Sequence, residues 1–434
     1  MPPTRSSEIA APAVGMRSPS RPASGLARSL SVAASFTLCA LLPIVMVLAN
    51  KSAPVALGIG CVLANASALA AGSGRELGRR YLATARTGSG LLLGLFLLWS
   101  ALSLTWTVSV PMTLRGLRET MPELMFGWGL AAAWPLVARR GDLRWLAPGI
   151  VASALLITFE AGTHLPLHKL VGARALALDL KRSSIPPLLL LWPAVALVSQ
   201  ARHWRMVVVL AAFAEVGSCL SHSSASVVAV LLGLGAYLLA RVRPRAALGA
   251  FATAIVLALL VAPYTGTVMT HIVSPPIERL LEEQHAKERI AIWSVFEGRV
   301  WDAPWLGHGF DASFRLGDAA ETPASRPGDS IIDDIHPHNQ LLQVWIDFGL
   351  AGAAGVLAGL GWLLGRLKRL PPLDLAPRIA FLFSATMMGL VGVQAWDAWW
   401  LATLAVCWAA FTVLREHPPA PDPGAAARDG AAAA

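Results

Sequence analysis

The chain has 434 residues, of which 55% are hydrophobic and only 14% are charged. Soluble domains carry about 25% charged residues, so this composition excludes an ordinary soluble protein and predicts an all-α, polytopic membrane protein. The formal charge of +9 is carried by arginines spread in pairs and triplets along the chain. Topology and anionic lipid account for such a distribution, and we expect no nucleic acid among the partners.

The apolar segments predict twelve membrane-spanning helices, each close to the roughly 20 residues that cross a bilayer. Nine of them form a membrane region at 31–263, a polar outer loop follows at 264–340, and three more form a second membrane region at 341–414. The ends, 1–30 and 415–434, have the composition of disordered cytoplasmic tails. The expected spans are 31–49, 53–71, 88–106, 121–138, 145–161, 185–200, 206–220, 224–240, 246–263, 341–364, 379–396 and 398–414.

Basic residues give the orientation of these spans. With both termini in the cytoplasm, every short inner loop is basic, as the positive-inside rule requires. The loops at 162–184 and 264–340 then share the outer side with the short turn at 107–120.

The loop at 264–340 contains a predicted helix and a flap. Apolar residues recur at helical spacing from Ile277 to about Val300, and Arg289 and Trp293 share one face of that helix because they are four apart. Breaks follow at 302–304 and 307–309, and 311–334 is predicted to be an irregular flap.

The loop closes on His336-Pro337-His338-Asn339, where the chain re-enters the membrane. An imidazole near its ordinary pKa of about 6.5 can accept a proton at neutral pH. A pair of histidines at a membrane surface therefore indicates chemistry more than the simple passage of a solute.

Three runs in this region together resemble the O-antigen ligase and polymerase superfamily of bacterial envelope glycosyltransferases. The resemblance implies transfer of a glycan from undecaprenyl diphosphate to an acceptor hydroxyl, which for a ligase belongs to lipid A–core. It also implies an inner-membrane protein whose active site faces the periplasm. The runs are Arg289-Ile-Ala-Ile-Trp293, Pro304-Trp-Leu-Gly307-His-Gly309 and His336-Pro-His338-Asn339, the last followed by Gly349 and Gly352 at the ligase spacing.

Site residues follow from this resemblance. Breaking a bond between sugar and diphosphate requires cations at the departing phosphate and benefits from a base at the incoming hydroxyl. His338 is expected to be that base or to orient the hydroxyl, and Arg289 to bind the diphosphate through its guanidinium fork. His336 and Trp293 are expected beside them in the substrate site. Asn339 either fixes the imidazole tautomer or caps the helix that follows.

Four more basic residues lie on the outer side, against the positive-inside trend. Arg115 and Arg118 are three apart and share a helical face, while Lys181 and Arg182 precede a proline pair. Each pair can bind substrate phosphate or anchor lipid headgroups, and both alternatives stay open.

Other polar and aromatic residues fall near the outer ends of the spans. Glu160 and Asp347 are expected to be solvated carboxylates there. Trp396, Trp399 and Trp400 are expected to form an interfacial aromatic belt.

No cofactor and no metal is expected. Asp333-Asp334 beside the two histidines could bind a cation, but the resemblance implies a metal-independent reaction with arginines in place of the ion. All four cysteines fall inside predicted spans, where they are typical small hydrophobes. They are Cys39, Cys61, Cys219 and Cys407.

The rivals within the class are a polymerase of O-antigen or exopolysaccharide and a protein O-glycosyltransferase, because acceptor choice lies in variable loops. The rival from another class is a secondary transporter, since twelve spans also suit that architecture. Two observations argue against transport: the chain has no repeated halves, and its ionisable residues concentrate in the outer loops.

Overall fold

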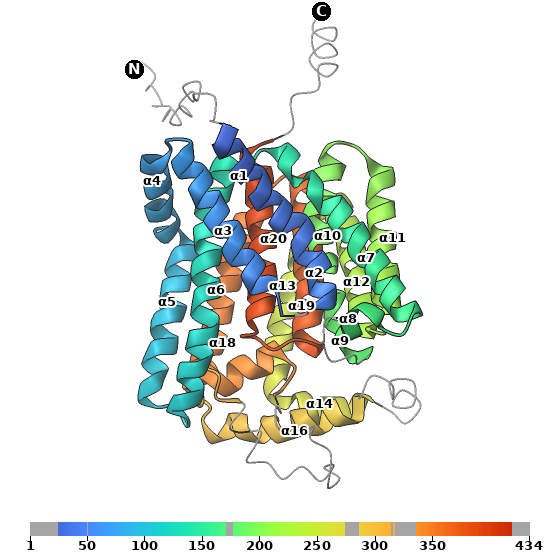
Figure 1. Cartoon of the computed structure of the whole chain (residues 1–434). Helices are drawn as coiled ribbons and strands as arrows, with labels where there is room; N and C mark the ends of the chain where they lie inside the picture. The colour runs from blue at the N-terminus through green and yellow to red at the C-terminus, as the bar shows by residue number, and fades with distance from the viewer. Residues whose placement is uncertain are drawn as a thin grey trace, which may run out of the picture.

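The computed structural model of the chain describes residues 25–49, 51–170, 177–273, 286–313, 316 and 336–418. This described part is almost wholly helical and contains no strand (Figure 1). Ten of its helical stretches are long and apolar enough to cross a membrane, judged by length and composition. The prediction of an all-α, polytopic membrane protein is therefore confirmed.

All twelve expected spans are helical, and the two outside the set of ten differ from the others in length or charge. The segment expected at 206–220 is α11 (Trp204–Leu220), which has only 17 residues. The segment expected at 121–138 is the second half of α6 (Val110–Val137), a helix of 28 residues whose first turns are charged. From the sequence alone, these first turns were predicted to be a loop, because their charged residues interrupt the run of apolar residues that marks a membrane helix.

The helices run along the bundle and change direction at short turns (Figure 1). Lipid cannot satisfy exposed backbone groups, so apolar runs of this length fold as helices. Proline occupies one of the first two positions of several of them, where its missing N–H breaks no helical bond. The helices before the large loop are α1 (Gly25–Phe36), α2 (Leu42–Leu48), α3 (Ala53–Ala70), α4 (Gly74–Ala85), α5 (Gly88–Leu102), α6, α7 (Leu146–Gly162), α8 (Pro166–Leu170), α9 (Ala177–Ser183), α10 (Ile185–Gln200), α11, α12 (Ser224–Val242) and α13 (Pro244–Val261).

The remaining helices include two that lie across one end of the bundle. These are α14 (Thr265–Ile272) and α16 (Ala286–Asp302), seen at the lower end in Figure 1. The helix predicted from Ile277 to Val300 is α16 where the structure describes it, and residues 274–285 lie outside the described part. The chain then continues through α18 (Gln340–Leu367), α19 (Pro372–Val391) and α20 (Ala398–Glu416).

The span expected at 379–396 corresponds to α19, but the helix starts seven residues earlier and ends five residues earlier. Pro371 is extended and Pro372 begins the helix, whereas Gly392 ends it. Asp374 and Arg378 made the first turn too polar to be recognised as part of a span. Residues 392–397 are thereby released to form a loop beside the start of α18.

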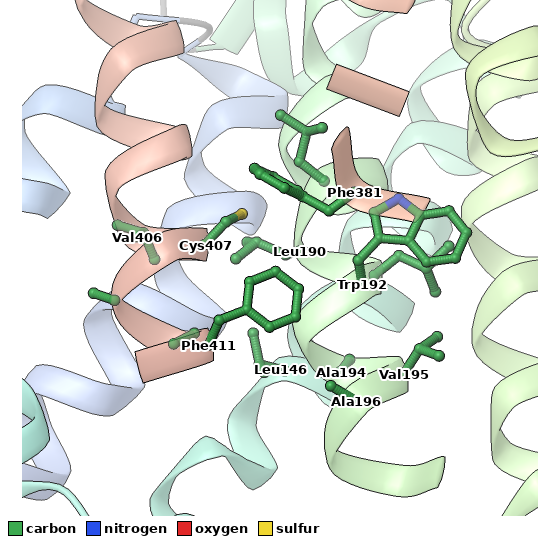
Figure 2. Packing of buried hydrophobic residues seen from close by; sticks show 14 of the residues in the cluster. Leu146, Leu190, Trp192, Ala194, Val195, Ala196, Phe381, Val406, Cys407 and Phe411 are labelled. Carbon is green, nitrogen blue, oxygen red and sulfur yellow. The ribbon is translucent and has the colours of Figure 1, made fainter. Parts of the chain in front are cut away.

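The interior of the bundle is one apolar cluster around Trp192 of α10 (Figure 2). The Trp192 Nε1 donates to Ser384 Oγ of α19 at 3.0 Å, and Ser384 Oγ donates to the carbonyl of Ala229 in α12 at 2.7 Å. A Cβ at Gly233 would lie 2.2 Å from the Trp192 ring, so only glycine allows α12 to approach α10 this closely. These contacts fix three helices of the bundle against one another.

Two tryptophans expected at the membrane interface are buried instead. Trp399 and Trp400 at the start of α20 are only 3% and 2% exposed and belong to the apolar core. The expectation of an aromatic belt is wrong for them, because the loop before α20 folds inward over the bundle rather than out toward lipid headgroups.

Candidate active site

The turn between the large loop and α18 brings two imidazole rings together. The ring centroids of His336 and His338 lie 3.8 Å apart in a T-shaped contact. His338 has a left-handed backbone, with φ of 46°, which points its ring back toward His336. Trp293 of α16 is buried beneath the turn and its Nε1 donates to the Pro337 carbonyl at 2.6 Å. Trp293 therefore positions the two rings.

Asn339 is the N-cap of α18. Its Oδ1 accepts from the backbone N–H groups of Leu341 and Leu342, both at 3.1 Å. The backbone of Asn339 is extended, as an N-cap requires. Of the two alternatives for this residue, the helix cap is the one that the structure displays.

Arg289 lies on the same face of α16 as Trp293, as the spacing predicted. Its guanidinium donates to the carbonyl of Val391 at the end of α19. Burial lowers the pKa of Arg289 below its ordinary value. The hydrogen bond to Val391 holds the guanidinium next to the histidine turn, close enough to His338 to lower the pKa of that imidazole.

A cavity of about 160 Å³ adjoins the histidine turn. Of the sequence-predicted residues it brings together Arg115, Arg182 and His336, which come from α6, α9 and the turn before α18. It leaves Arg118, Lys181, Arg289, Trp293, His338 and Asn339 outside its lining. His338 lies behind His336, with which it is in ring contact. The remaining lining residues are Lys51, Gly116, Glu119, Thr120, Asp311, Gln394, Trp396 and Asp397.

Several lining residues, among them Lys51, Asp311 and Gln394, were not predicted from the sequence. Lys51 lies in the turn between α2 and α3, and Gln394 lies in the loop before α20, far from any recognisable motif. Asp311 follows the Gly307-His308-Gly309 run directly, and that proximity was the one available signal. It was assigned to a flap instead, because nothing in the sequence shows that the chain folds inward at that point.

Asp311 is buried against α6. Its side chain covers Gly116, where a Cβ would lie 2.6 Å from the Asp311 carboxylate, and Gln394 Nε2 donates to its Oδ1 at 3.4 Å. Burial, and next the neighbouring Asp347 carboxylate, raise the pKa of Asp311 to about 8. Burial also raises the pKa of Asp397. Lys51, Arg115 and Arg182 face three carboxylates in the lining, those of Glu119, Asp311 and Asp397. A proton on Asp311 leaves the cavity with one positive charge in excess, which suits an anion.

His338 is held neutral. Burial lowers its pKa to about 2, with further contributions from His336 and then from the guanidinium groups of Arg289 and Arg182. The Nδ1 of His338 is buried and has no hydrogen-bond partner among the described residues. A neutral imidazole with an unused ring nitrogen can accept a hydrogen bond or a proton from a bound hydroxyl.

The loop before the flap is fixed against α18 by backbone pairing. The N–H groups of His308 and Gly309 donate to the carbonyls of Ile346 and Asp347 at 2.8 and 3.0 Å. Gly349 breaks α18 at this point with φ of 57°, and a Cβ there would lie 2.7 Å from the Pro304 carbonyl oxygen. The glycine after the histidine motif therefore allows the close approach of this loop.

Two acids expected to be solvated are fully buried. The Asp347 carboxylate accepts from Trp396 Nε1 at 2.6 Å, and Glu160 is paired with His168 at 2.5 Å. The expectation was wrong for both, because each carboxylate finds hydrogen-bond donors inside the protein. The Asp333-Asp334 cation alternative lies outside the described residues. Within them, no group of three or more His, Cys, Asp or Glu side chains could hold a metal ion.

Comparison with known proteins agrees with this geometry. Residues 206–357 match the O-antigen ligase family. A protein of Rickettsia conorii, named as a candidate polysaccharide ligase, is 21% identical over 71% of this chain and 75% of its own length. A similarly named protein of Rickettsia felis is 22% identical over 71% of this chain and 76% of its own length. The chain is therefore similar to the O-antigen ligase family over residues 206–357, and to these two proteins over most of its length.

Proposed function

We propose that this chain transfers a glycan from an undecaprenyl-diphosphate carrier to an acceptor hydroxyl of lipid A–core, at the periplasmic face of the bacterial inner membrane. Similarity to the ligase family supports the general part of this function, which is glycosyl transfer to build a polysaccharide. The observation that carries the proposal is the cationic cavity of about 160 Å³ beside the paired imidazoles of His336 and His338.

In this proposal the donor diphosphate lies between the cavity and α16. Lys51 and Arg182 supply positive charge in the cavity, where Arg115 adds a guanidinium that is paired with Glu119 at 3.0 Å. Arg289 supplies positive charge at the histidine turn. Guanidinium groups suit phosphate because they donate two parallel N–H bonds. Leu114 next to Arg115 is 51% exposed on the outside of α6, so the polyprenyl tail can leave the phosphates directly into lipid.

The acceptor hydroxyl approaches His338. Its oxygen bonds to the anomeric carbon of the donor sugar while the bond from that carbon to the phosphate oxygen breaks. The electron pair of the broken bond stays on undecaprenyl diphosphate, and the hydroxyl proton passes to the unused ring nitrogen of His338. Negative charge on the diphosphate offsets the guanidinium groups that lower the pKa of His338, so protonation becomes easier once donor is bound.

Reconstitution with defined substrates tests the proposal. The purified chain is placed in proteoliposomes with an undecaprenyl-diphosphate-linked repeat unit and, in parallel, with lipid A–core, a second lipid-linked repeat unit or a hydroxyl-bearing peptide. We expect lipid A–core to become glycosylated, with release of undecaprenyl diphosphate in equal amount. If instead the second lipid-linked repeat unit is elongated, or the peptide is glycosylated, that molecule is the acceptor and lipid A–core is not. Failure to release undecaprenyl diphosphate with every acceptor would refute glycosyl transfer from this donor.

A further inference from the structure

A second and larger cavity lies at the opposite end of the bundle. Its volume is about 430 Å³, and residues of α4, α6, α18, α19 and α20 line it. The candidate active site lies where α18 begins, whereas this cavity lies where α18 and α20 end. Figure 1 shows α4 at that upper end, with α16 at the lower one. The part of α18 after its break at Gly349, residues 350–367, rises about 27 Å, so the two cavities lie at opposite ends of the bundle.

The polar rim of this cavity has more positive than negative charge. Arg80 is paired with Glu416 at 2.7 Å, and Glu416 is the only carboxylate among the described residues of the lining. Arg366, Arg378 and Arg415 therefore contribute three guanidinium groups without a carboxylate of the lining to balance them.

These three arginines differ in how firmly they are held. Arg378 donates to the carbonyls of Asp374 at 2.5 Å and Phe411 at 3.0 Å, and its guanidinium lies 4.9 Å from the Phe411 ring centroid. Arg366 and Arg415 are exposed at the ends of their helices. Arg378 is thus fixed inside the cavity, whereas the side chains of Arg366 and Arg415 can move to contact a bound group.

The wall next to the arginines is apolar. Trp362 of α18 and Trp408 of α20 lie with ring centroids 6.4 Å apart, beside Leu363 and Phe381. A Cβ at Gly88 would lie 2.1 Å from Trp362 Nε1, so the start of α5 packs directly on this indole. Trp408 is 44% exposed on the outside of the bundle. The apolar wall therefore leads from the arginines toward the surface that faces lipid.

We propose that this cavity binds an anionic phospholipid, with its phosphate among Arg366, Arg378 and Arg415 and an acyl chain along Trp362 and Trp408. Basic pockets between membrane helices recognise such headgroups, because guanidinium binds phosphate oxygens and the helices hold the chain. A free phosphate would use the arginines alone and leave the apolar wall without a role. A zwitterionic headgroup would add an ammonium to a site that already has excess positive charge.

Native mass spectrometry of the purified full chain tests this binding. Dioleoylphosphatidylglycerol and dioleoylphosphatidylcholine are titrated separately, and inorganic phosphate is added as a competitor. We expect phosphatidylglycerol to bind at least about fivefold more tightly than phosphatidylcholine, and inorganic phosphate at equal concentration to displace neither. Equal affinity for the two lipids, or displacement by equimolar inorganic phosphate, would overturn the proposal.

Variants locate the lipid. Arg366→Gln together with Arg415→Gln should weaken phosphatidylglycerol binding more than tenfold, since each arginine contributes about fivefold. The matched control is Arg369→Gln, an exposed arginine of the same surface outside the lining, which should change binding less than about twofold. Without added lipid, the double variant and Arg369→Gln should unfold at the same temperature as the wild type. If the double variant unfolds at a lower temperature, Arg415→Gln alone is used in its place. Equal weakening in Arg369→Gln would contradict a defined site.

Discussion

At the scale of single residues, the site depends on side chains whose surroundings differ from those of free amino acids. His338 is kept neutral by burial and by cations, and Asp311 is kept protonated by burial and by a second carboxylate. The sequence identified His338 and Arg289 because motifs carry them. The sequence did not identify Asp311, because its burial against Gly116 of α6 depends on packing between distant parts of the chain.

Arg289 is predicted to act through its fork of N–H donors. Arg289→Ala should lower glycan transfer by about 100-fold or more, and Arg289→Lys should restore little of it, because an ammonium cannot bind two phosphate oxygens in one plane. Arg299 on the same helix, which pairs with Asp302 at 3.5 Å, provides the control. Initial rates of glycan transfer by these variants and the wild type are compared in the reconstituted assay. A fully active Arg289→Ala protein would show that Arg289 does not bind the donor.

Asp311 is predicted to make stability depend on pH. Its pKa is raised to about 8 in the folded protein, above the ordinary value of 3.8, so the folded state retains a proton that the unfolded state has lost. Folding stability should therefore fall as pH rises from about 4 to about 8, by at most about 1.4 kcal/mol for each pH unit. Thermal unfolding of wild type and Asp311→Asn across this range measures the difference.

The asparagine variant should have a flatter profile in that window, with the largest advantage over wild type above about pH 8. Asp302→Asn, which removes an exposed carboxylate from α16, should keep the wild-type slope. Parallel profiles for wild type and Asp311→Asn would show that this carboxyl group does not titrate as described.

At the scale of elements, α18 connects the histidine turn to the bundle. Its start is set by the Asn339 cap, and its course is broken at Gly349, where the loop at 304–307 lies against it. The sequence predicted the position of this helix closely and missed the break, because apolar periodicity continues across it. The start of α6 was missed for the opposite reason, since its first turns are charged although they are helical.

The break in α18 predicts unequal effects for two glycines of the same helix. Gly349→Ala should destabilise the protein by about 2–3 kcal/mol, because the residue has φ of 57° and a Cβ there would meet the Pro304 carbonyl. Gly355→Ala has open space around its Cβ and should be neutral or stabilising by up to about 1 kcal/mol. The free energy of unfolding of the two variants is compared in detergent. Equal stability would show that position 349 does not require glycine.

The cap at Asn339 separates two roles that the sequence left open. Asn339→Ala should cost about 1 kcal/mol of stability, and Asn339→Ser should keep most of it because a hydroxyl also caps. If the residue acts through the cap alone, Asn339→Ser should transfer glycan at close to the wild-type rate. A stable but inactive serine variant would instead assign the amide a direct part in the reaction.

At the scale of the whole molecule, the fold was more predictable than the site. Runs of apolar residues determine that the chain forms membrane helices, because lipid leaves the backbone few alternatives. The cavity joins Lys51, Arg115, Arg182 and His336 from four separate parts of the chain. No local pattern relates such positions to one another, so the sequence predicted Arg115, Arg182 and His336 as separate candidates and did not predict Lys51. Their grouping depends on packing.

Transfer by variants of His338 tests the central claim most directly. His338→Ala and His338→Asn both remove the imidazole, and asparagine also tolerates the left-handed backbone at this position. His271→Asn, an exposed histidine at the same end of the bundle, is the matched control. We predict that both His338 variants bind undecaprenyl diphosphate like the wild type while glycan transfer falls by about 100-fold or more, and that His271→Asn keeps its activity. Transfer within a few-fold of wild type in His338→Asn would contradict the account.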